Sequence, residues 1–193
     1  MSNLKKIIPI SIIALFCTYQ VQAQGAPKKN KSPKAKTTQV KKKPIKVVHD
    51  KVAYKKSKGK VVTVRTLPKK NIIKHKGVNY YYANKRYYTY TGGRYIPIIP
   101  KAGFRIKTLP VGYIVINRPS RTYFWFNGIF YTKSNNEYEV IEPEIGTVIY
   151  ELAPDAEKVT VNGNTYYEYS NVLYEKVQIN GSRAYEVVGY IEG

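Results

Sequence analysis

The sequence has little of what catalytic and metal sites are made from. It contains one cysteine, Cys17, and two histidines, His49 and His75, among 193 residues. It has no Gly-flanked serine nucleophile, no Gly-rich phosphate loop and no spaced set of metal-ligating histidines and cysteines. His49 precedes Asp50, but neighbouring side chains on an extended segment point apart and do not form a base with its orienting carboxylate. We therefore expect no enzyme, no cofactor and no metal site.

Acidic residues are scarce until the last third of the chain, where four of them cluster: Glu137, Glu139, Glu142 and Glu144. Carboxylate oxygens are the ligands that Ca²⁺ takes, so a calcium site is one interpretation. The other is a strand with a solvated face, because Glu137 and Glu139 alternate and an acidic edge discourages edge pairing. We favour the second interpretation.

Long apolar runs are also absent, and the one short run lies at the N-terminus. A cationic start precedes an apolar stretch of 11 residues, 7–17, whereas a membrane-spanning helix needs roughly 20. Small residues follow, as in a cleavable signal peptide. We expect a signal peptide over 1–23, cleaved between Ala23 and Gln24, with export to the periplasm, the outer membrane or the exterior. Cys17 would leave with it, which excludes disulfides and thiolate chemistry in the mature chain.

Charge is segregated along the chain. Lys and Arg number 33 against 12 Asp and Glu, for a formal net charge of +21. The net charge is +18 over residues 25–76, +9 over 77–136 and −8 over 137–193. Low hydrophobicity and like-charge repulsion predict a disordered Lys- and Pro-rich tail over 24–60.

Two interpretations of this basic region stay open. One is a solvated spacer that keeps the protein in solution. The other is a polycationic arm for lipid phosphates, acidic polysaccharide or released DNA, where binding gains from counterion release and is weakly selective. The residues that we expect to bind anionic polymer are Lys41, Lys42, Lys43, Lys55, Lys56, Lys85, Arg86 and Arg94.

Aromatic pairs recur at a fixed spacing after the basic region. Tyr80-Tyr81, Tyr123-Phe124 and Tyr166-Tyr167 are each 43 residues apart, and a second series follows in step, at Tyr87-Tyr88, Phe130-Tyr131 and Leu173-Tyr174. Such a period predicts repeated supersecondary structure, with units over 61–100, 103–143 and 146–189.

Within each unit the residues favour strands and tight turns. Asn-Gly pairs such as Asn127-Gly128 separate runs of Val, Ile, Thr, Tyr and Phe, a strong hairpin signal. We predict an all-β fold of three tandem, mostly meander-like units of about five strands, packed as small barrel-like or curled sheets. In the third unit we place the strands at 146–152, 158–161, 165–169, 172–178 and 183–189.

The pattern of Leu-Pro, paired aromatics around a turn, Tyr-x-Val and Pro-x-x-Gly over roughly 61–189 resembles a family of Tyr-rich secreted repeat proteins of Gram-negative bacteria. That family is known as a domain of unknown function. The resemblance implies an exported β-repeat protein and transfers no functional residue.

The chain has 20 tyrosines, and their default role is core and cross-strand packing. Consecutive rings such as Tyr80 to Tyr82 point to opposite faces, so we expect some rings to be exposed in the first unit, beside the basic charge. The candidates for exposed aromatic contacts are Tyr81, Tyr88 and Trp125.

Two functions follow as alternatives. The first is a non-enzymatic envelope protein that binds anionic polymer, such as lipopolysaccharide or acidic glycan, through the basic arm. The second is an assembly protein in which the basic N-terminal part of one chain meets the acidic third unit of another. The partners expected are thus an anionic polymer, a membrane surface, another envelope protein or a second copy, and no specific nucleic acid.

Overall fold

The computed structural model of the protein describes residues 43–56, 59 and 61–193. Within these residues the chain forms three β-sheets and one 3₁₀ turn, His49–Lys51, which confirms the all-β prediction. In the described part, no helix is long and apolar enough to cross a membrane. The expected signal peptide, its cleavage site Ala23 and Gln24, and Lys41 and Lys42 lie outside the described residues.

The four-stranded sheet is an antiparallel meander. Its strands pair in chain order: β3 (Asn71–His75), β4 (Val78–Ala83), β5 (Arg86–Thr91) and β6 (Arg94–Ile98). The turns are two-residue turns with positive φ, such as Gly92-Gly93, which glycine adopts without steric cost. We predicted five strands in this unit, but the segment before β3 contributes a single bridge, Val64 to Tyr95.

The five-stranded sheet has the order β7-β11-β10-β9-β8. Its strands are β7 (Arg105–Ile106), β8 (Ile114–Asn117), β9 (Thr122–Phe126), β10 (Ile129–Ser134) and β11 (Glu137–Val140). The Asn127-Gly128 turn joins β9 to β10, as its sequence predicts.

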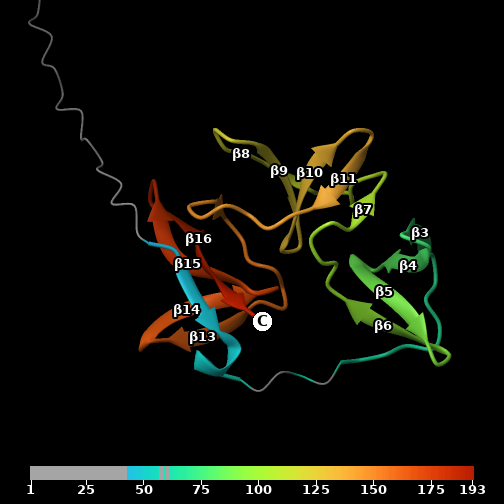
Figure 1. The fold of residues 1–193 in the computed structure, drawn as a ribbon, viewed down its shortest axis with the longest axis horizontal. Helices are drawn as coiled ribbons and strands as arrows, with labels where there is room; N and C mark the ends of the chain where they lie inside the picture. Colours follow the sequence, from blue (N-terminus) through green and yellow to red (C-terminus); the bar gives the residue numbers. More distant parts are fainter. Residues whose placement is uncertain (1–42, 57–58, 60) are drawn as a thin grey trace, which may run out of the picture. The chain divides into compact units, whose positions relative to one another are not determined.

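The seven-stranded sheet includes the last part of the chain and two strands from far upstream. The downstream strands are β12 (Val148–Ile149), β13 (Glu157–Val161), β14 (Asn164–Tyr169), β15 (Val172–Ile179) and β16 (Ser182–Glu192). They match the five strands predicted for the third unit. β1 (Ile45–Val48) pairs in parallel with β16, and β2 (Val52–Tyr54) pairs antiparallel with β13, as Figure 1 shows in cyan against orange and red.

For residues 45–54, these two strands correct the prediction of a disordered tail over 24–60; residues 24–42 of that expected tail lie outside the described residues. Val47 and Val52 are buried in a core with Val159, Val161 and Leu173. β1 pairs with β16 at one end of the strand order, and β2 pairs with β13 at the other end. Because only three residues join β1 to β2, the two edges of the sheet are drawn together and the sheet curls into a nearly closed barrel. The abundance of lysine over 24–60 hid this short alternation of apolar residues.

Gly189 on β16 allows β1 to approach closely. A Cβ at this position would lie 2.1 Å from the carbonyl oxygen of Ile45. Ile45 stands opposite Gly189 in the parallel register. The absence of a side chain at Gly189 is therefore a condition for the closure of the sheet.

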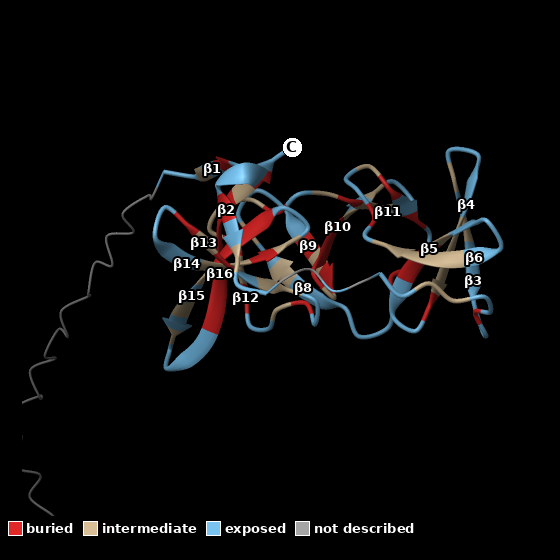
Figure 2. Cartoon of the chain, turned by 90° about the horizontal axis from the view of Figure 1, so that it is seen from below, coloured by how far each residue is buried: buried red, intermediate tan, exposed pale blue. Residues whose placement is uncertain are grey.

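The central strands β9 and β10 of the five-stranded sheet are buried on both faces, whereas β8 is mostly exposed. Phe126 and Tyr131 pack in one cluster with Tyr87 of the four-stranded sheet, while Tyr123 and Trp125 pack in another with residues of the seven-stranded sheet. Figure 2 shows buried stretches in β9, β10 and β13 to β16, whereas β3, β4 and β6 are mostly exposed or half-buried.

Candidate functional site

The structure gathers four of the predicted basic residues around one groove. Lys55, Lys56, Lys85 and Arg86 line a hollow of about 1160 Å³. Lys55 and Lys56 follow β2, whereas Lys85 and Arg86 lie at the turn from β4 to β5. These four residues meet because β2 pairs with β13, which adds a strand of the N-terminal region to the seven-stranded sheet. Lys43 and Arg94 do not line this groove.

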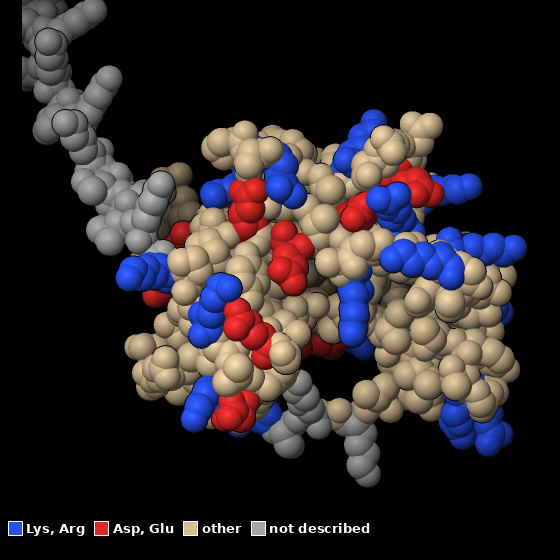
Figure 3. Space-filling view, viewed as in Figure 1, with Lys and Arg blue, Asp and Glu red and all other residues tan. Residues whose placement is uncertain are grey.

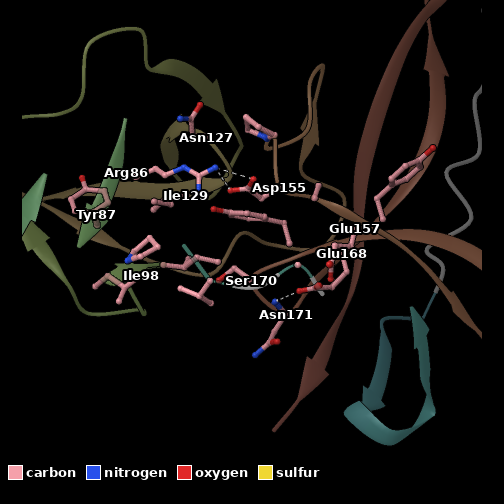
Figure 4. Close-up of a pocket in the computed structure, with 18 of the residues that line it drawn as sticks. Arg86, Tyr87, Ile98, Asn127, Ile129, Asp155, Glu157, Glu168, Ser170 and Asn171 are labelled. Carbon is pink, nitrogen blue, oxygen red and sulfur yellow. Dashed lines mark hydrogen bonds and ion pairs between the residues drawn. The ribbon is translucent and has the colours of Figure 1, made fainter. Parts of the chain in front are cut away.

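The walls of the groove come from all three sheets. Figure 4 shows Tyr87 and Ile98 of the four-stranded sheet and, in the β9–β10 hairpin of the five-stranded sheet, Asn127 and Ile129. The strands and loops of the seven-stranded sheet contribute Asp155, Glu157, Glu168, Ser170 and Asn171 (Figure 4). Tyr87 and Ile129 are buried apolar residues of the shared core. The groove thus combines an apolar base with a polar rim.

Three turns, one from each sheet, hold the groove in shape. The side-chain amide of Asn127 donates to the carbonyl oxygen of Lys85 at 3.3 Å. Gly128 packs against Tyr169 so closely that a Cβ would lie 2.4 Å from the Tyr169 ring. The backbone amide of Asn171 donates to the Glu168 carboxylate at 2.8 Å. The β4–β5, β9–β10 and β14–β15 turns therefore meet at one place.

Two of the three carboxylates of the groove, those of Asp155 and Glu168, are already engaged. Arg86 pairs with Asp155 at 2.8 Å, and both side chains are about half exposed. Glu168 is buried and also accepts a hydrogen bond from the Tyr54 hydroxyl at 3.4 Å. Lys55, Lys56 and Lys85 are exposed, and among the described residues no ion pair engages their ammonium groups. These three lysines, together with the exposed Lys158 in the same lining, are cations of the groove that an anionic ligand can reach.

Buried phenols adjoin the groove and stay neutral. The Tyr87 and Tyr131 hydroxyls share a hydrogen bond of 2.9 Å. Burial raises the pKa of Tyr87 to about 12 and also raises the pKa of Tyr131. Burial, reinforced by the charge of Asp155, raises the pKa of Tyr169 to about 12. These tyrosines therefore order the groove walls as neutral side chains.

The outer face of the four-stranded sheet carries a second feature, three tyrosines in contact. The Tyr90 and Tyr95 ring centroids are 4.7 Å apart, and Tyr81 lies 5.1 Å from Tyr95 and 6.4 Å from Tyr90. We name Tyr81, Tyr90 and Tyr95 the aromatic platform. The Lys70 ammonium lies 5.5 Å from the Tyr95 ring centroid, a cation–π distance.

Two of the three aromatic candidates prove wrong. Tyr88 is 7% exposed because Leu67 and Val64, in the segment before β3, cover it. Trp125 is 3% exposed because its face of β9 packs against residues of the seven-stranded sheet. Tyr81 is half-buried within the platform. Sequence reasoning missed Tyr90, which is 51% exposed and lies two residues beyond Tyr88 on the same face, past the covering segment.

The histidines occupy separate places. His75 is half-buried, with its ring centroid 5.0 Å from that of Phe104, and His49 stacks on Tyr54 at 6.5 Å. His75 is therefore packed against an aromatic ring. In the ranges that the structure describes, no group of three or more His, Cys, Asp and Glu side chains is placed to hold a metal ion.

Comparison with known proteins gives one match. The sequence model of a family of unknown function, DUF6515, matches residues 51–191. The matched range includes all three sheets except β1 and the end of β16. No curated protein and no solved structure matches the chain.

Proposed function

The chain belongs to DUF6515, a family of unknown function, and we propose that this member is a non-enzymatic, exported envelope protein that binds anionic polymer. The polymer is of the lipopolysaccharide or acidic-glycan class. The observation that carries the proposal is the meeting of Lys55, Lys56 and Lys85 at one groove, without ion-pair partners among the described residues.

Long-range charge supports the same proposal. Residues 51–136 contain no Asp or Glu. Figure 3 shows acidic side chains over the seven-stranded sheet and beside β11, while Lys and Arg stand out over the four-stranded sheet. A polyanion that reaches this surface releases counterions, which favours binding at low salt.

The design of the test follows from the fold. Deletion of all residues up to 60 would remove β1 and β2 and open the seven-stranded sheet. The sharper comparison is a chain of residues 24–193, a chain of residues 43–193, and the triple variant Lys55→Gln, Lys56→Gln, Lys85→Gln. A matched triple variant removes the same charge elsewhere, at Lys101, Lys133 and Lys176.

Binding to lipopolysaccharide and to heparin, with neutral dextran as control, is measured at several salt concentrations. We expect binding to fall steeply with salt, and the groove triple variant to lose about tenfold or more in affinity at low salt. The control triple should lose much less. Equal losses in both triples would mean that net charge alone binds the polymer and that the groove has no special role.

We propose further that the three sheets are copies of one unit. The cross-strand pairs Tyr81–Tyr88, Phe124–Tyr131 and Tyr167–Tyr174 are equivalent in register. Each pair flanks a two-residue turn with positive φ, at Asn84-Lys85, Asn127-Gly128 and Ser170-Asn171. Because these turns form the groove, the ligand site lies where the three copies meet.

Self-assembly through opposite charges is the second candidate. The structure already pairs basic and acidic parts within one chain, as in Arg86–Asp155 and Lys46–Glu192 at 3.1 Å. These pairs reduce the charge left for contacts between chains, so we rank assembly below polymer binding. Oligomers at low ionic strength that dissociate near 0.5 M salt in sedimentation would reverse this ranking, because screening there is short-ranged at roughly 4 Å.

A further inference from the structure

The aromatic platform has the features of a ligand surface and not of a core. Tyr90 is 51% exposed, and the neighbouring Ile72 is 60% exposed. Ile72 stands opposite Tyr81, and Tyr90 stands opposite Tyr95, so these side chains share one face of the four-stranded sheet. The opposite face supplies Tyr87, with Ile73, Tyr80, Tyr82 and Ile98 beside it, to the core. Core packing therefore explains the apolar side chains on one face of this sheet, but only some of those on the other face.

The surroundings of the platform are cationic. Lys70 lies over the Tyr95 ring and Lys74 follows Ile72 on the same face, whereas Arg94 alternates with Tyr95, lies on the opposite face and donates to the Thr63 hydroxyl at 3.3 Å. Residues 61–101 contain no Asp or Glu. A ligand of this face must therefore carry anionic groups next to a surface that can stack on aromatic rings.

We propose that the aromatic platform is a sugar-stacking site for an acidic polysaccharide. The faces of aromatic rings carry partial negative charge, and the C–H bonds on one face of a sugar ring carry partial positive charge. Tyr90 would stack on a sugar ring, while Lys70 and Lys74 would pair with carboxylate or sulfate groups on the same or neighbouring sugars. This inference rests on the proposed function and names polysaccharide as the class of polymer.

The ring geometry favours sugars over nucleobases. Tyr90 and Tyr95 are tilted by 49°, and Tyr81 makes angles of 70° and 86° with Tyr90 and Tyr95. Successive flat bases of a single strand each need a ring face to stack on, and these rings do not present parallel faces. Sugar rings in a polysaccharide turn relative to one another at each glycosidic link, which suits a platform of inclined rings.

The test compares probes that differ in one property. The chain of residues 24–193 is titrated with hexagalacturonate, an acidic sugar chain, with inorganic polyphosphate of similar charge, with neutral cellohexaose and with oligothymidylate. Three variants are compared with it: Tyr90→Ala removes the ring, Tyr90→Phe keeps it, and Tyr150→Ala removes a ring that is 62% exposed outside the platform. The near-ultraviolet circular dichroism of each variant confirms that the fold is retained.

We expect Tyr90→Ala to lower the affinity for hexagalacturonate by about tenfold, a stacking-sized loss, and to leave polyphosphate binding unchanged. Tyr90→Phe and Tyr150→Ala should behave like the unchanged chain. Hexagalacturonate binding that survives Tyr90→Ala would overturn the platform but leave the proposed anion-binding groove standing. A loss confined to oligothymidylate would replace sugar by nucleic acid, and failure of all three anionic probes would overturn the proposed function itself.

Discussion

The four-stranded and the seven-stranded sheet are built from the same kind of Tyr-rich strand, yet they are completed in different ways. The seven-stranded sheet recruits β1 and β2, closes nearly into a barrel and buries Val159, Leu173 and Val187 completely. The four-stranded sheet recruits no distant strand, and its outer face is covered only in part, by Leu67 and Val64. Similar local sequence thus gives a closed core at one end of the chain and a partly open face, the proposed ligand surface, at the other.

Charge follows the same division. The acidic residues gather in residues 137–193, where the core is most complete, whereas residues 61–101 are free of Asp and Glu. We therefore propose a division between the two sheets: the seven-stranded sheet supplies most of the stability, and the four-stranded sheet supplies the binding surface. The predictions below test that division, beginning with the largest expected effect.

The first prediction compares one apolar side chain in each sheet. Leu173 is 0% exposed in the seven-stranded sheet, and Ile72 is 60% exposed in the four-stranded sheet. Leu173→Ala should lower the free energy of unfolding by about 2–5 kcal/mol, because it leaves a cavity. Ile72→Ala should change it by less than about 0.5 kcal/mol. Denaturant titration followed by tryptophan fluorescence measures both, and equal costs would contradict the division.

The second prediction concerns the closure of the seven-stranded sheet. Gly189→Ala places a Cβ against the Ile45 carbonyl oxygen, so β1 must shift or detach. We expect a loss of about 1–3 kcal/mol and faster amide hydrogen exchange over residues 45–54. Gly163→Ala is a useful contrast, because nothing lies within 4 Å of its added Cβ, although its φ of 79° brings backbone strain. Only Gly189→Ala should accelerate exchange in β1; unchanged exchange there would show that β1 does not close the sheet.

The third prediction compares two buried phenols. The Tyr131 hydroxyl is paired with that of Tyr87, whereas the Tyr174 hydroxyl is buried without a hydrogen-bond partner among the described residues. Tyr131→Phe strands the Tyr87 hydroxyl and should destabilise the protein by about 1–2 kcal/mol. Tyr174→Phe removes an unpaired polar group and should be neutral or stabilising by up to about 1 kcal/mol. Thermal unfolding of the two variants measures the difference, and a similar loss in both would contradict it.

The extent to which sequence predicted this structure differs between local and distant features. The strands β12 to β16 of the seven-stranded sheet were predicted to within a few residues, because Asn162-Gly163 and Asn180-Gly181 mark turns between them. β1 and β2 were missed, because their few apolar residues are stabilised by partners more than 100 residues away. No local pattern encodes such a contact.

The candidate site shows the same limit. Strand alternation places Tyr88 and Trp125 on a face but does not say what covers that face, so both were wrongly expected to be exposed. Lysine content identified Lys55, Lys56, Lys85 and Arg86, but their meeting at one groove depends on the pairing of β2 with β13. Local chemistry was readable in the sequence, and its arrangement was not.

The last prediction concerns the ion pair that joins the two regions, Arg86 of the four-stranded sheet with Asp155 beside β13. The pair is about half exposed, so Asp155→Asn should cost less than about 1 kcal/mol of stability. The same change frees the Arg86 guanidinium and removes a negative charge from the groove. We therefore expect heparin to bind a few times more tightly at low salt, with the gain fading as salt screens the charges. Glu175→Gln, which removes a carboxylate outside the groove lining, is the control. An equal gain in both variants would assign the effect to net charge, whereas a gain confined to Asp155→Asn would locate the polymer at the groove where the basic and acidic regions meet.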